Sequence, residues 1–143
     1  MTPLQKVYDA FLSKILEDEW AEWTEEEVNA DLLTLLEGAV DQFKFPRHSL
    51  EIEGDNFADD LTNEEIQILA SYMKCEWLNR TILTWENVKP LYEERDFSQA
   101  NLLAKFNETL AAERKAAERR ESKYYRSIDN KPFDYTKLAT QLN

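Results

Sequence analysis

Apolar residues recur every three to four positions in four separate stretches of the chain, which predicts helices that each bury one face. The first stretch starts at Thr2-Pro3, where a hydroxyl N-cap and a proline in the first turn favour a helix start, and it ends near Glu17. The second starts at Thr24, with Glu27 in capping-box spacing, and ends before Phe45-Pro46 because proline disfavours a helical residue ahead of it. We expect these two helices to pack together as an antiparallel hairpin.

The third stretch has the strongest helix-start signal in the chain. Thr62 and Glu65 stand in a second capping box, and Leu61 with Ile66 has the spacing of a hydrophobic staple. Residues 44–61, which precede this helix, alternate in part between polar and apolar and carry a turn signal. They predict at most a short strand or a two-stranded arm.

A corner segment, residues 96–101, leads into the fourth helix. Ser98 is a favourable N-cap, and the charge of Asp96 is favourable beside the positive end of a helix. We place Phe97 in the core. The corner between the third and fourth helices is therefore expected to be fixed by Asp96, Phe97, Ser98, Gln99 and Asn101.

The fourth helix is predicted to be too long for a compact domain. From 98 to 126 it has 29 residues and spans roughly 43 Å, whereas a domain of this size has a radius of gyration of about 14–15 Å. Between Ala111 and Lys123 alanine is its only apolar residue type. We expect the distal turns to project and to contact a neighbouring subunit through Tyr124 and Tyr125, the alternative being a freely solvated charged helix.

Residues 127–143 show no sustained periodicity, yet they carry Phe133, Tyr135 and Leu138. Aromatic anchors in an extended segment are typical of a peptide that becomes ordered on binding, although chain termini are often disordered. We interpret the segment as a docking arm that binds through these three residues.

The complete prediction is a mostly α fold in one domain. The 143 residues, 43% of them hydrophobic, suffice for one core. Residues 1–126 form a small helical bundle, which contains an irregular or β-arm insertion at 44–61 and the long helix at 98–126. Residues 127–143 form an extended C-terminal arm.

Cysteine content and hydropathy bear on where the protein is made. Cys75 is the only cysteine, so no intrachain disulfide can form, and the chain opens on a polar helix start where a secretory signal needs a long apolar run. We expect synthesis in a reducing cytoplasm. The apolar runs are only a few residues long, far short of the roughly 20 that span a bilayer, so no membrane segment is expected.

The acidic residues are concentrated in the N-terminal half. Residues 1–65 hold 18 acidic and 4 basic residues, a net charge of −14, whereas residues 66–143 hold 11 acidic and 13 basic residues, a net charge of +2. This distribution argues against sequence-specific nucleic-acid binding, because a phosphate-binding face needs clustered cations. It is compatible with a surface past which DNA slides, for which Glu25, Glu26 and Glu27 are candidates, and also with a merely solvated face.

No pattern in the chain indicates catalysis, a metal or a cofactor. Only two glycines are present, so no phosphate-cradling loop can be built. A nucleophilic system would have to join His48 in a linker to Cys75 on an apolar helix, and we interpret these instead as a surface residue and a packed one. The adjacent carboxylates of Asp59-Asp60 lack calcium-loop spacing. We therefore expect no enzyme activity.

Three segments of the chain carry a family resemblance. They are Phe43-x-Phe45-Pro46-Arg47-x-x-Leu50, then Phe57-x-x-x-Leu61-Thr62-x-x-Glu65-Ile66-x-Ile68-Leu69-Ala70-x-x-Met73-x-x-x-Trp77-Leu78, then Asp96-Phe97-Ser98-Gln99-Ala100-Asn101-Leu102. Together they resemble the neck proteins of tailed bacteriophages, which are also called head-tail connectors or adaptors. The likeness covers about residues 45–110 and contains no catalytic residue.

The resemblance implies a structural virion protein. Such a protein is a small helical bundle that forms a ring, commonly of twelve subunits, between the portal protein and a downstream neck or tail protein. It is assembled in the host cytoplasm, and the ring surrounds the channel through which DNA passes. The alternative from another class is a cytoplasmic helical adaptor or regulatory module that binds one protein partner.

Overall fold

A computed structural model describes residues 1–15, 23–88, 97–128 and 131–132, with the backbone alone for 85–88, 97–102, 128 and 131–132. The described residues form four helices, in keeping with the predicted mostly α fold class, which is confirmed. The helices are α1 (Leu4–Leu12), α2 (Glu25–Gln42), α3 (Asn63–Val88) and α4 (Phe97–Tyr125).

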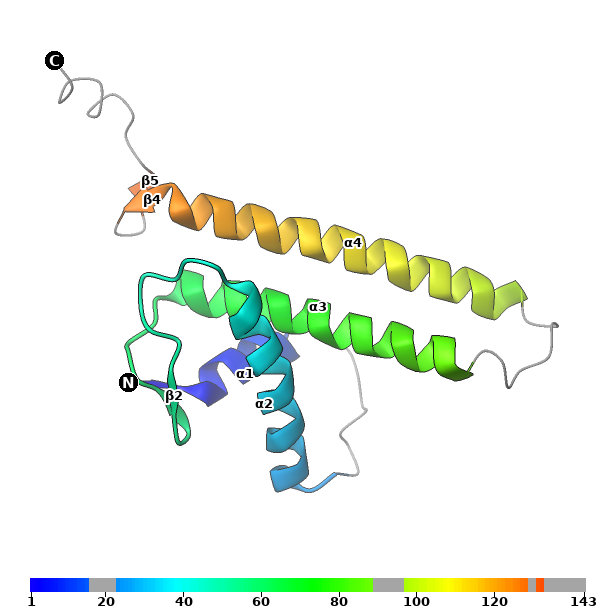
Figure 1. Ribbon diagram of the computed structural model, residues 1–143, viewed down its shortest axis with the longest axis horizontal. Coiled ribbons are helices and arrows are strands. Elements are labelled where there is room, and N and C mark those ends of the chain that lie inside the picture. Colours follow the sequence, from blue (N-terminus) through cyan, green and yellow to red (C-terminus); the bar gives the residue numbers. More distant parts are fainter. Residues whose placement is uncertain (16–22, 89–96, 129–130, 133–143) are drawn as a thin grey trace, which may run out of the picture.

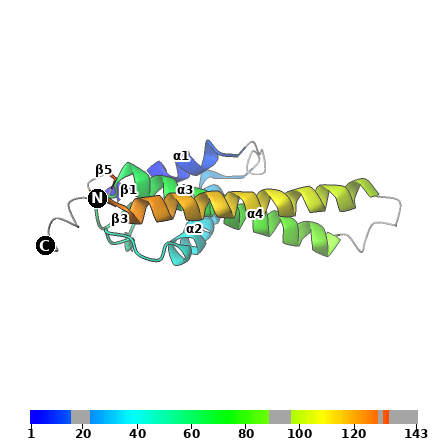
Figure 2. The same ribbon diagram turned by 90° about the horizontal axis from the view of Figure 1, so that it is seen from above.

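Helix α3 is the central helix, against which the other three helices pack. In Figure 1, α4 lies along one side of it and α1 and α2 lie on the other; Figure 2, seen from above, shows α1 and α2 on opposite flanks of α3. The core forms where these helices meet, and α3 contributes to it the fully buried Ile68, Leu69 and Met73. Helix α3 therefore takes part in two packing layers, one with α4 and one with α1 and α2.

The predicted α1–α2 hairpin is wrong. The principal contacts of both helices are with α3 and not with each other, and α2 crosses α3 steeply (Figure 1). Gly38 is the point of close approach, because a Cβ built there would lie 2.8 Å from Cδ of Glu76 on α3. The buried face of α2, which includes Leu36 and Ala39, thus packs against α3 and not against α1.

The N-terminus adds a strand, which the sequence did not predict, to the two-stranded arm that was expected within residues 44–61. Strand β1 (Thr2–Pro3) pairs with β3 (Asn56–Phe57), and β3 pairs with β2 (Ile52–Glu53), both antiparallel. Gly54 makes the β2–β3 turn with a φ of 63°. The hydroxyl of Thr2 accepts a 2.7 Å hydrogen bond from the backbone N–H of Leu61, so Thr2 ties the chain start to the α3 entrance and is not the helix N-cap that we predicted.

The long fourth helix has the predicted length of 29 residues and begins one residue early, at Phe97. Ser98 consequently lies in its first turn and not at the N-cap. Asp96 is outside the described residues, as are the side chains of Phe97, Ser98, Gln99 and Asn101. The corner role of these five residues stays a prediction.

The end of α4 that projects is opposite to the one predicted. In the C-terminal half, Ala117, Glu121 and Tyr124 are buried against the rest of the chain, and Lys74 of α3 binds Glu113 across the helix pair at 2.9 Å. Where α3 ends and α4 begins, the two helices instead extend beyond α1 and α2 (Figure 1). The prediction failed because this half of α4 is buried through one alanine, one glutamate and one tyrosine, which leave no stripe of large apolar residues in the sequence.

After α4 the chain turns into a short hairpin. Strands β4 (Ser127–Ile128) and β5 (Lys131–Pro132) pair antiparallel. The rest of the predicted docking arm lies outside the described residues, and with it Phe133, Tyr135 and Leu138.

The α3–α4 contact gives a direct stability prediction. Ala117 is buried and its neighbour Ala116 is exposed on the same helix. Ala117→Leu should lower the free energy of unfolding by about 1–3 kcal/mol, because extra methyl groups overpack a closed contact. Ala116→Leu, the matched control, should change it by no more than about 0.5 kcal/mol. Equal unfolding curves for the two variants in urea would show that α4 does not dock as described.

Candidate functional site

A strap of residues 43–48 is held by side chains from α3 and α4. Each of its backbone N–H groups from residue 44 to 48 donates to one of these side chains, except at Pro46, which has no N–H. The four hydrogen bonds are Lys44 to Glu121 at 3.3 Å, Phe45 to Tyr125 at 3.0 Å, Arg47 to Tyr124 at 2.7 Å and His48 to Glu65 at 3.3 Å. We call the strap and these four acceptor side chains the clamp.

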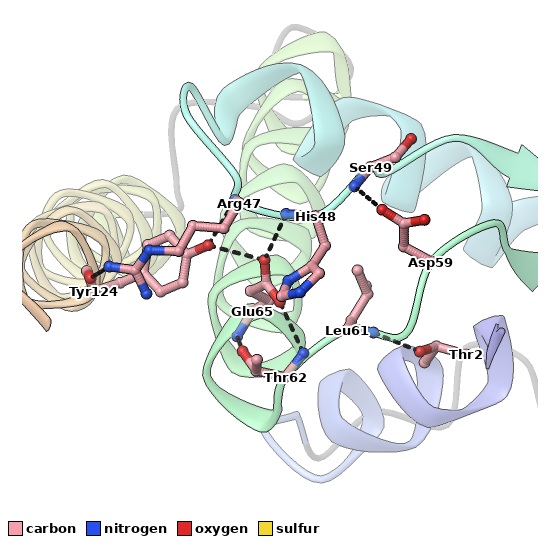
Figure 3. A network of polar contacts seen from close by, with 9 residues as sticks. All are labelled: Thr2, Arg47, His48, Ser49, Asp59, Leu61, Thr62, Glu65 and Tyr124. Atoms are coloured by element: carbon pink, nitrogen blue, oxygen red, sulfur yellow. Dashed lines mark hydrogen bonds and ion pairs between the residues drawn. The ribbon is translucent and has the colours of Figure 1, made fainter. Parts of the chain in front are cut away.

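Glu65 is the centre of the clamp. Its side chain is fully buried, and its two oxygens accept four hydrogen bonds (Figure 3). Oε1 receives the backbone N–H of Thr62 at 2.8 Å and contacts Nδ1 of His48 at 2.8 Å, while Oε2 receives the hydroxyl of Tyr124 at 2.9 Å and the backbone N–H of His48. The Glu65 N–H in turn donates to the Thr62 hydroxyl at 3.2 Å, so the predicted capping box is complete.

The pKa of Glu65 reflects this environment. Burial acts to raise the pKa, because a carboxylate loses its hydration, but the hydrogen bonds from Thr62, Tyr124 and His48 stabilise the ionised form. Their combined effect is larger, and the pKa of Glu65 lies below its ordinary value. A buried, ionised carboxylate therefore joins the start of α3 to the strap and to the end of α4.

Tyr124 connects α4 to the same centre. Its hydroxyl donates to Glu65 and accepts the N–H of Arg47 (Figure 3). Its ring meets Phe43 edge to face, with 5.4 Å between centroids and 82° between planes. Burial raises the pKa of Tyr124 to about 12, so the hydroxyl stays a donor at neutral pH. Tyr124 is thus fully used within the chain, which corrects our prediction that it contacts a neighbouring subunit.

Arg47 caps the C-terminal end of α4. Its guanidinium donates to the carbonyl oxygens of Tyr124, at 2.5 Å, and of Ser127. It also lies over the Tyr124 ring, with Cζ 4.2 Å from the centroid. Carbonyls in the last turn of a helix lack intrahelical partners and carry the negative end of the dipole, so a cation there is favourable. The strap residue Arg47 consequently fixes where α4 ends.

Glu121 repeats this arrangement one turn earlier on α4. The carboxylate is nearly buried and accepts the hydroxyls of Tyr72 from α3 and Tyr125 from α4, in addition to the N–H of Lys44. Burial and the bond to Glu121 raise the pKa of Tyr72 well above its ordinary value, and burial raises that of Tyr125 to about 12. Two buried carboxylates therefore bind the same strap from two different helices.

The clamp displays two aromatic rings to solvent. Phe45 is 73% exposed although its backbone is hydrogen-bonded to Tyr125, which is itself 39% exposed. Their ring centroids lie 5.9 Å apart at an interplanar angle of 63°. We call this pair the aromatic patch. Tyr125, one of the predicted partner-binding residues, is thus available at the surface, and Phe45 adjoins it without having been singled out for that role.

The other predicted residues lie elsewhere. Glu25, Glu26 and Glu27 form the exposed first turn of α2, whose C-terminal end, and not this one, enters the strap. Thr24 caps that turn by accepting the Glu27 N–H at 3.2 Å, as predicted. Cys75 is buried, and burial raises the pKa of its thiol to about 11, in keeping with a packed residue.

His48 differs from its sequence interpretation. Its side chain is about two-fifths exposed, but the ring and the backbone both contact Glu65. No local signal predicts this pairing, because His48 and Glu65 are 17 residues apart and Tyr124 is 59 residues from Glu65. The capping box located Glu65, while its further partners depend on the tertiary fold.

Within the described residues no group of three or more His, Cys, Asp or Glu side chains is placed to hold a metal ion. No helix in the described part of the chain is both long and apolar enough to cross a membrane. Comparison with protein-family models, with curated proteins and with solved structures found no match for this chain.

The buried carboxylate gives a second stability prediction. Glu65→Gln replaces one acceptor oxygen by an NH2 group that faces existing donors, so at least one buried donor loses its partner, at a cost of about 1–3 kcal/mol. Glu64→Gln on the same turn is the matched control, because no hydrogen bond in the described structure uses its carboxylate. It should cost at most about 0.5 kcal/mol. Urea unfolding at neutral pH measures both, and similar losses would contradict the assigned role of Glu65.

The same group predicts a pH dependence. Because the folded-state pKa of Glu65 lies below its ordinary value of 4.5, its stabilising contribution is fully present above pH 4.5 and is lost as the pH falls through the folded-state pKa. The melting-temperature difference between wild type and Glu65→Gln should therefore shrink between about pH 5 and pH 3. A difference that stayed constant over this range would mean that Glu65 is not ionised in the fold.

Proposed function

We propose that this chain is a structural virion protein that forms a ring, commonly of twelve subunits, in the neck of a tailed bacteriophage. The ring would join the portal protein to a downstream neck or tail protein and surround the DNA channel. It would be assembled in the host cytoplasm and would act by binding, without catalysis or a cofactor. The observation that carries the proposal is the joining of two resemblance segments in one clamp.

The clamp supports the proposal because of the residues that build it. Phe43, Phe45 and Arg47 come from the first resemblance segment, and Thr62 with Glu65 from the second. The two segments are linked at Glu65 of the second, which His48, at an unspecified position within the first, contacts through its backbone N–H and its ring. Members of a structural family are expected to keep the residues that build a common structural feature. The joint use of the two segments in the clamp therefore favours a shared architecture over a chance likeness.

The aromatic patch supplies a surface suited to a protein partner. Phe45 and Tyr125 are exposed, yet their backbone and hydroxyl groups are held by the clamp. Aromatic side chains that are already ordered lose little conformational freedom on binding and are enriched among the residues that dominate protein interfaces. We assign the patch to the contact with the portal or with the next neck protein.

Size-exclusion chromatography with light scattering tests the proposal. The chain alone at high concentration, or mixed with the portal protein, should elute as a closed oligomer with the mass of a ring. A chain that stays monomeric and binds a single cytoplasmic protein one to one would indicate the alternative, a helical adaptor or regulatory module.

The predicted docking arm gives a truncation test. The cut belongs after Pro132, because Ser127 is bound to Arg47 and β4 (127–128) pairs with β5 (131–132). Removing residues 133–143, which include Phe133, Tyr135 and Leu138, should leave the helical circular dichroism and the melting temperature unchanged and abolish incorporation into particles. Normal incorporation of the shortened chain would rule out a docking role for this segment.

The acidic first turn of α2 gives a test of the channel. Glu25, Glu26 and Glu27 are exposed there, and negative charge would let DNA pass without adhering. In an assembled ring, replacing all three with Gln should raise retention of duplex DNA at low salt by a few-fold and slow genome ejection. If DNA retention and ejection match those of the wild-type ring, these residues do not line the channel.

A further inference from the structure

Helix α4 carries a row of cations along its solvent face. Lys115, Arg119 and Lys123 are exposed and follow one another at four-residue spacing, which places them on one side of the helix, and the exposed Arg126 directly follows its last residue, Tyr125. The row is roughly 16 Å long at 1.5 Å per residue. It stands out in a chain whose net charge is −12. We call it the basic stripe.

Helix α2 carries the opposite arrangement. Glu26, Glu37 and Asp41 are exposed on the side of the helix that faces away from the buried Leu32 and Leu36. This row, the acidic stripe, is roughly 22 Å long, with Glu37 and Asp41 one turn apart and Glu26 eleven residues before Glu37. The two rows are therefore opposite in sign.

The stripes make no ion pairs within the described part of the chain, although the exposed Glu118 lies three residues from Lys115 on α4. No ion pair between described residues involves Lys115, Arg119, Lys123, Glu37 or Asp41. Like charges four residues apart on a helix repel, as Glu37 with Asp41 and Lys115 with Arg119 do. Asp41 is also in the last turn of α2, where the helix dipole disfavours an anion and where no basic residue compensates it. An opposite charge from outside would relieve all three conflicts.

No ion pair between described residues joins the two stripes within one molecule. Helix α4 and helix α2 each pack on α3 (Figure 1), and the spacing of the exposed charges places each stripe away from the buried face of its own helix. A contact between a face of one molecule and a different face of another is heterologous, and repetition of such a contact closes a ring when the rotation allows it.

We infer that the basic stripe of α4 binds the acidic stripe of α2 on a second copy of this chain. A second copy is favoured over nucleic acid because the strongly negative charge of the whole chain repels phosphates, whereas the acidic stripe supplies a complementary partner. The flank of α4 also has room for partner side chains, since a surface hollow of about 300 Å³ lies beside the stripe, bordered by Leu110, Ala111 and Lys115 among others. The inference rests on the ring proposed above and names the contact that builds it.

Charge reversal with rescue tests the contact. One variant carries Lys115→Glu and Arg119→Glu, and the other carries Glu37→Lys and Asp41→Lys. The first variant leaves the α4 stripe with no net charge, and the second makes the α2 stripe net positive. Each alone therefore loses the charge complementarity of the contact, so self-association measured by sedimentation velocity should weaken by more than about tenfold. An equimolar mixture should recover the wild-type oligomer, because each variant then complements the other. Glu51→Lys with Glu53→Lys, exposed residues outside both stripes, is the control with the same charge change and should associate as wild type does.

Wild-type association should also weaken steeply between about 0.05 M and 0.5 M salt, because screening shortens the range of exposed charges. Normal association of both variants, failure of the mixture to recover the oligomer, or a wild type that is monomeric at every concentration would overturn the inference. So would binding of a short DNA duplex that Lys115→Glu with Arg119→Glu abolishes while assembly is unchanged. The proposed neck function fails separately, if an assembled wild-type oligomer binds neither portal nor tail components.

Discussion

The architecture depends on one buried carboxylate. Glu65 forms a capping box with Thr62 at the start of α3. The same carboxylate also accepts hydrogen bonds from the strap and from the end of α4, so it joins all three segments. A buried carboxylate is costly unless its oxygens are satisfied, and here they accept four hydrogen bonds. The same bonds that keep Glu65 ionised therefore fix the relative positions of three segments far apart in the sequence.

The sequence predicted the parts of the fold that rest on local chemistry. The Thr24 N-cap, the Thr62–Glu65 capping box, the bounds of α2 and the length of α4 were anticipated, because Thr24, Thr62 and the helical periodicity act within a few residues. The predictions that failed concern residues whose partners lie far away in the sequence. Thr2 accepts a hydrogen bond from Leu61 instead of capping a helix. Tyr124 is buried and donates to Glu65, although its neighbours in the sequence are charged.

The candidate site was predictable only in outline. The resemblance pointed to Phe45, Arg47 and Glu65 as residues of one family pattern, but their hydrogen bonds to α4 have no counterpart in sequence spacing. The clamp leaves Phe45 and Tyr125 exposed while restraining them, and it sets where α4 ends. Surfaces that are already ordered lose little conformational freedom on binding, which would suit the joining function that we propose.

The clamp is tested most directly by amide hydrogen exchange in the strap. Phe45 and Arg47 lie outside any helix or strand, so their N–H groups would exchange almost freely if the strap were an ordinary loop. Because these groups donate to the hydroxyls of Tyr125 and Tyr124, we predict protection comparable to that of the α3 core amides, with a marked loss at Arg47 in Tyr124→Phe. Exchange of both amides at the rate of an unstructured peptide would contradict the account.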